Sequence, residues 1–88
     1  MNAREEELTA RALLADPAQV DVHLQQKRWA TLAALVRFAR RDVPVQLAQT
    51  DPALYRLLRE QITRLFKQMG FEEVEFRSEQ WSDTLPPS

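Results

Sequence analysis

The sequence predicts a helix-rich α+β domain, and two kinds of apolar spacing lead to that class. In three segments, apolar residues recur with the 3.6-residue period of amphipathic helices: about 3–15, 26–41 and 52–69. After Gly70 the period changes to two, which predicts a C-terminal strand at about 71–77. A partner strand is predicted at 19–24, where valines and a leucine alternate with polar residues.

The helix at 52–69 carries the clearest start and end signals. Asp51 is suited to be its N-cap, because the carboxylate can accept from free amides of the first turn. Pro52 fits the first helical position, and Gly70 can close the helix in a left-handed conformation. The apolar stripe between them comprises Leu54, Leu57, Leu58, Ile62, Leu65, Phe66 and Met69.

The other two helices rest on apolar faces and charge placement. The helix at 26–41 has a wide apolar face, so we expect it to contact more than one neighbour. For the helix at 3–15, Asn2 can act as the cap, and three glutamates in the first turns suit the positive end of the helix dipole.

The predicted C-terminal strand needs a partner, because a lone strand leaves its backbone groups unpaired. Segments 20–24 and 43–47 share the pattern Val-x-Val-x-Leu. Pro44 confines the second segment to a sheet edge or irregular structure, so the first is the better candidate. The alternative is an all-α bundle whose C-terminal strand pairs across a dimer.

Residues 1–81 are predicted to form a single globular domain, because a chain of 88 residues can build one modest core. Residues 82–88 are polar and proline-rich, and we expect a flexible tail there. The predicted core comprises Leu8, Trp29, Leu32, Val36, Leu54, Leu57, Leu58, Ile62, Leu65, Phe66, Val74 and Phe76.

Composition argues against an enzyme. There is no cysteine, which excludes disulfides, thiol catalysis and cysteine metal sites. The single glycine excludes glycine-rich phosphate loops. The one histidine, His23, has no acid or nucleophile at a spacing that suggests catalysis. We therefore predict no catalytic residues, no cofactor and no metal site.

The sequence also predicts a cytoplasmic protein that does not enter the membrane. No apolar run approaches the roughly 18 residues needed to cross a bilayer. The first residues are acidic and lack the cationic start and apolar stretch of a signal peptide.

Charge is sorted along the chain, although the total is only −1. Residues 27–67 hold nine Lys/Arg against three acids, a net of +6. Residues 1–26 hold two arginines against five acids, and residues 68–88 hold one arginine against five acids, giving −3 and −4. Long-range attraction depends on where charge lies, so the basic middle is a candidate surface for a partner.

The candidate basic surface comprises Arg37, Arg40, Arg41, Arg56, Arg59 and Arg64. These side chains could bind an acidic protein or nucleic acid, or they could pair with the acidic ends of the same chain. A second candidate surface, for strand pairing or dimerisation, comprises Phe71, Val74, Phe76 and Trp81.

The order of a strand at 20–24 followed by two helices resembles that of ribbon-helix-helix DNA-binding proteins, over about half of the chain. That resemblance implies two strands paired across a dimer, with Gln19, Asp21 and His23 facing the major groove. Asp21 would repel phosphates, and the resemblance is one of element order without a specific motif.

The resulting hypothesis is a small cytosolic, non-enzymatic protein of the adaptor or accessory type. It would act through protein–protein interaction, as a homodimer, because no catalytic constellation is present and the strand needs a partner. The alternative is a nucleic-acid-binding regulator that uses the basic surface of two helices.

Overall fold

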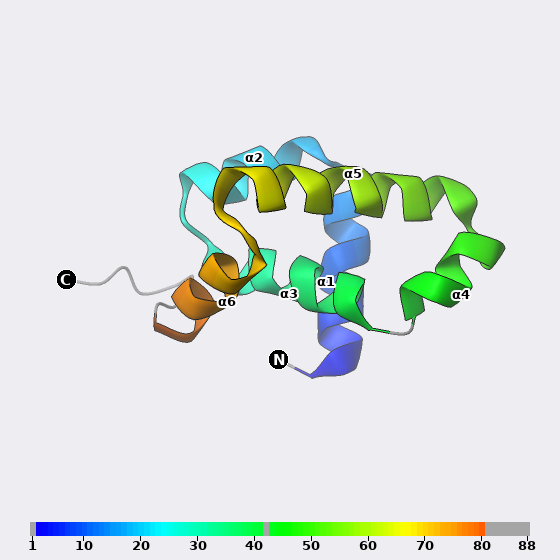
Figure 1. Cartoon of the computed structure of the whole chain (residues 1–88), viewed down its shortest axis with the longest axis horizontal. Coiled ribbons are helices and arrows are strands. Elements are labelled where there is room, and N and C mark those ends of the chain that lie inside the picture. Colours follow the sequence, from blue (N-terminus) through cyan, green and yellow to red (C-terminus); the bar gives the residue numbers. More distant parts are fainter. Residues whose placement is uncertain (1, 42, 81–88) are drawn as a thin grey trace.

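The computed structural model describes residues 2–41 and 43–80, and this part of the chain contains helices and no strand (Figure 1). The elements are α1 (Ala3–Ala15), α2 (Ala18–Gln25), α3 (Trp29–Arg40), α4 (Val43–Thr50), α5 (Pro52–Met69) and α6 (Phe71–Gln80). The α+β prediction is therefore wrong, and so is the alternative that kept a C-terminal strand. The predicted tail at 82–88 lies outside the described residues.

Helix α3 lies at the centre of the fold. The five consecutive residues from Leu32 to Val36 are fully buried, and so is Phe38. Five consecutive residues point around the whole circumference of a helix, so α3 is covered on every side. All five other helices contact it, as expected from its wide apolar face. In Figure 1, α5 lies above α3, and α1 crosses α3 steeply.

Helices α1 and α5 confirm the predictions made from their end signals. The Asn2 side chain accepts from the Glu5 amide at 2.8 Å, and α1 packs Ala10, Leu13 and Leu14 into the core. At the start of α5, the Asp51 carboxylate accepts from the Leu54 amide at 3.2 Å. The bounds of both helices match the predicted segments.

The predicted core is correct for most of its members. Six are buried, namely Trp29, Leu32, Val36, Leu58, Leu65 and Val74, and Leu54, Leu57 and Ile62 pack against them in partly buried positions. Three are wrong, because Leu8, Phe66 and Phe76 are each more than half exposed. The prediction missed Leu14, Val20, Leu35 and Phe38, which are fully buried side chains.

The segment predicted as a partner strand, 19–24, is helical and belongs to α2. Its alternating pattern covers only five residues, and Val20 and Leu24 also lie four apart, on one face of a helix. Val20 is fully buried and Leu24 packs against the core. Segment 43–47 is likewise helical, in α4, with Pro44 in the first turn, where a missing N–H costs nothing. The strand required for a ribbon-helix-helix arrangement is therefore missing at 20–24.

The segment predicted as the C-terminal strand, 71–77, is also helical and belongs to α6. Val74 is fully buried, whereas Phe76 is 54% exposed, so the two side chains do not share a face. Arg77 Nε lies 2.7 Å from Glu73 Oε1, an i,i+4 pair that only a helix brings together. A helix satisfies its own backbone groups, so the predicted interface made by strand pairing does not exist at 71–77. Trp81, the fourth residue predicted for that interface, lies outside the described residues.

Gly70 alone connects α5 to α6. Its amide donates to the carbonyls of Leu65 and Phe66, at 3.3 and 3.0 Å, and closes α5. Its φ is positive as predicted, but its ψ of 157° differs from that of a left-handed helical residue and directs the chain into α6. This region of φ and ψ is open essentially to glycine alone.

We expect Gly70→Ala to lower the free energy of unfolding by about 1–3 kcal/mol, through backbone strain. An added Cβ meets nothing within 4 Å, so steric overlap with neighbours adds nothing to this cost. Urea denaturation of the full chain measures the effect. A semisynthetic chain with D-alanine at position 70 is the control, because D-alanine favours positive φ and should retain stability. Equal losses for the two alanines would contradict the assignment to backbone strain.

Helix α2 ends in a Schellman motif with a lysine where glycine is usual. The Arg28 amide donates to the His23 carbonyl at 3.0 Å, and the Lys27 amide donates to the Leu24 carbonyl at 3.2 Å. Lys27 has a φ of 57°, the left-handed conformation that costs a residue with a Cβ about 1–2 kcal/mol.

We expect Lys27→Gly to raise the free energy of unfolding by about 0.5–1 kcal/mol, because glycine adopts this conformation without strain. Lys27→Ala is the matched variant, since it removes the same exposed side chain but keeps the Cβ. Urea denaturation should show a gain for glycine only. A similar gain for alanine would assign the effect to the lysine charge instead.

Candidate functional site

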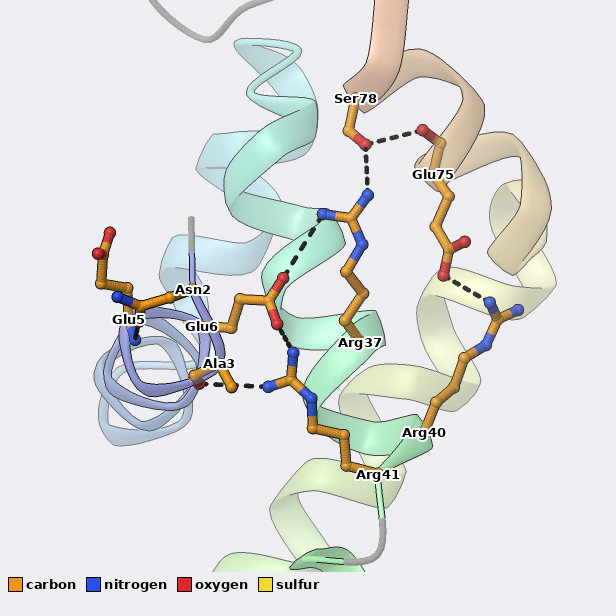
Figure 2. Close-up of polar contacts among 9 residues, drawn as sticks. All are labelled: Asn2, Ala3, Glu5, Glu6, Arg37, Arg40, Arg41, Glu75 and Ser78. Atoms are coloured by element: carbon orange, nitrogen blue, oxygen red, sulfur yellow. Dashed lines mark hydrogen bonds and ion pairs between the residues drawn. The ribbon is translucent and has the colours of Figure 1, made fainter.

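The arginines at the end of α3 are engaged within the molecule. Glu6 of α1 is buried, and its carboxylate lies between two of them (Figure 2). Arg37 Nη1 is 3.6 Å from Glu6 Oε2, and Arg41 pairs with Glu6 Oε1. Arg41 Nη1 also donates to the Ala3 carbonyl at 3.2 Å. Arg37 and Arg41, two residues of the predicted basic surface, therefore link the end of α3 to α1 through ion pairs.

Arg40 points in the other direction, toward α6 (Figure 2). Its Nη1 lies 2.5 Å from Glu75 Oε1, and its Nη2 lies 3.5 Å from Glu72 Oε1. The guanidinium also sits 5.2 Å from the ring centroid of Phe71. Ser78 accepts from Arg37 Nη2 at 3.4 Å, so α6 is held by two arginines of α3.

Arg64 of α5 is engaged as well. Its guanidinium pairs with Asp21 of α2, and its Nη1 donates to the buried Gln61 Oε1 at 2.7 Å. Asp21 and Arg64 are both partly exposed, so their pair adds at most about 1 kcal/mol to stability. Its main consequence is that the charge of Arg64 is balanced by an acid of the same chain.

Arg56 and Arg59 differ from the other four candidates. Both are exposed on α5, and neither forms an ion pair with any residue in 2–41 or 43–80. The Arg59 guanidinium lies 6.0 Å from the ring centroid of Tyr55. Within these ranges, the two cations are therefore not engaged in ion pairs.

Both free arginines line a surface pocket of about 690 Å³ along α5. A second pocket of about 280 Å³ lies between α3 and α5. Tyr55, Arg59 and Thr63 line both pockets, which shows that the two adjoin; together we name them the α5 groove. The smaller pocket adds the apolar side chains of Ala39, Leu58 and Ile62.

The α5 groove thus combines an apolar floor with a cationic rim. The floor can accept an apolar side chain, and the rim can pair with carboxylates or phosphates. Of the residues that line the groove, Arg56 and Arg59 were predicted from the sequence, whereas Tyr55 and Thr63 were not. A signal for these two was present, because Tyr55, Arg59 and Thr63 follow each other at four-residue spacing on one helix face.

The predicted strand-pairing residues do not form a common surface. Phe71 is partly buried, with its ring 5.2 Å from that of Phe66 in an edge-on arrangement. Val74 is buried against the core, and Phe76 is exposed on α6.

Within the described ranges, no three His, Asp or Glu side chains are grouped so that they could hold a metal ion. His23, the residue considered for catalysis, is half-buried in α2. Among the same residues, none of the helices combines the length and the apolar character needed to span a membrane.

Comparisons of the chain with protein-family models, with curated proteins and with solved structures found no match. Its function must therefore be inferred from its own residues.

We expect Glu6→Gln to lower the free energy of unfolding by about 1–3 kcal/mol, because Arg37 and Arg41 lose their shared carboxylate. Glu5→Gln is the matched control on the same helix, since Glu5 is exposed and pairs with no described arginine or lysine. Its loss should be a few tenths of a kcal/mol, from the helix dipole. Thermal and urea unfolding measure both variants, and equal losses would show that the Glu6 pairs contribute nothing specific.

Proposed function

We propose that this chain is a non-enzymatic binding domain that docks another protein on the α5 groove. The observation that carries the proposal is the difference among the six candidate arginines. Four pair with acids of the same chain, while Arg56 and Arg59 are exposed in the α5 groove, whose smaller pocket has apolar lining residues. The lack of cysteine is compatible with the cytoplasm, where we place this activity.

The residues of the α5 groove favour a protein partner. Tyrosine and arginine are enriched where protein interfaces gain most of their affinity, and Tyr55 lies directly beside Arg59. Apolar side chains next to arginines match the usual arrangement of an interface, with an apolar centre and a polar rim.

Nucleic acid is the weaker candidate. The alternative required cations from two helices, but Arg37 and Arg40 of α3, and Arg41 directly after it, pair with glutamates of α1 and α6. The homodimer hypothesis depended on an unpaired strand at 71–77, and that segment is helical. The proposal therefore requires neither nucleic acid nor a second copy of the chain.

Site-specific photocrosslinking in the native cells tests the proposal. We expect a benzoylphenylalanine at Thr63, in the groove, to give a protease-sensitive, nuclease-resistant adduct of higher mass. The same group at Ala12, exposed on α1 and outside the groove, is the control and should give none. The proposal fails if neither position gives an adduct, or if both give the same one.

A further inference from the structure

We infer that the partner inserts an acidic segment carrying one large apolar side chain into the α5 groove. This inference rests on the proposed function, and it specifies the chemistry of the partner. Its basis is a pair of cations on one face of α5 that form no ion pair with any acid in residues 2–41 or 43–80.

The spacing of the two cations suits carboxylates. Arg56 and Arg59 are three residues apart, so both guanidinium groups lie on the same side of the helix. A guanidinium binds a carboxylate through two parallel hydrogen bonds, and this geometry distinguishes arginine from lysine. Two acids on neighbouring turns of a partner helix, or two apart on an extended segment, can reach both arginines.

The smaller pocket supplies the apolar requirement. It lies between α3 and α5, with Leu58 and Ile62 from the core side and Tyr55 at its edge. Its volume of about 280 Å³ is enough for one large apolar side chain. Since Arg59 lines both pockets, an acid next to that apolar residue would lie close to Arg59.

A polyphosphate backbone matches this surface less well. Glu60 lines the same pocket as the two arginines and would repel an evenly charged strand. Non-specific nucleic-acid binding gains its strength by neutralising many phosphates. Of the cations of α5 that line the larger pocket, only Arg56 and Arg59 form no ion pair with a described acid. A peptide can place its acids beside Arg56 and Arg59 and leave a neutral residue opposite Glu60.

The test is fluorescence anisotropy with the full chain and a labelled twelve-residue peptide that has four glutamates around one leucine. The comparison probes are the same peptide with glutamines for the glutamates, the same peptide with alanine for leucine, and a labelled twelve-nucleotide single strand. We expect the glutamate–leucine peptide to bind most tightly and to weaken several-fold between 50 and 200 mM salt, because exposed charges are screened.

Arg56→Gln and Arg59→Gln should each lower the affinity for the glutamate–leucine peptide about three- to fivefold, the upper part of the range for exposed ion pairs. Lys67→Gln is the matched control, because it removes an exposed cation of α5 outside the groove and should leave the affinity unchanged. Circular dichroism confirms that each variant is folded.

Tighter binding of the glutamine peptide, unchanged affinity in both arginine variants, or tighter binding of the oligonucleotide would each overturn the inference. These results are distinguishable from failure of the proposed function. If Thr63 crosslinks to a protein in cells but the acidic peptide does not bind, a protein docks there with different chemistry. If Thr63 gives no adduct, the proposed function itself fails.

Discussion

The burial of α3 on all sides is the constraint on which the rest of the structure depends. Leu32, Ala33, Ala34, Leu35 and Val36 follow one another along the helix, and each is fully buried. These side chains point to all sides of α3, so burying them requires neighbouring helices on every side. Each of the other five helices contacts α3. Ala33 and Ala34 have small side chains, so the neighbouring helices can approach the backbone of α3 closely at these positions. A short chain thus obtains its core by wrapping the outer helices around one apolar helix.

The charge pattern of the sequence follows from this arrangement. Arginines project from the end of α3, where the helix leaves the core, and their apolar stems can pack along it. The acidic ends of the chain form α1 and α6, which both pack on α3 and bring Glu6, Glu72 and Glu75 to these arginines. A basic middle between acidic ends is therefore, in large part, a chain that neutralises itself on folding. Glu6 is the buried member, so its loss would expose two arginines to each other without a counter-charge.

The parts of the fold that could be predicted from the sequence are those with local signals. Asp51, Pro52 and Gly70 identify α5 because caps act through atoms a few residues away. The two predicted strands failed because five to seven alternating residues fit either period, and tertiary contacts decide between them. In α6 the contacts are Val74 in the core and Arg77 beside Glu73, with the Arg77 guanidinium 5.1 Å from the Trp29 ring centroid. Of these contacts, only the pair of Glu73 and Arg77, four residues apart, could be read from spacing alone.

The candidate site shows the same division between local and tertiary information. The sequence indicates six arginines on two helices, but which of them remain free depends on where the acids fold. Arg64 lies within two turns of Arg59, yet it reaches Asp21 of α2, whereas Arg59 lies over Tyr55 on the groove side. A surface charge left unpaired after folding costs little stability, because water solvates it. Arg56 and Arg59 therefore contribute no ion pair to the described part of the fold, and the role proposed for them is in binding at the α5 groove.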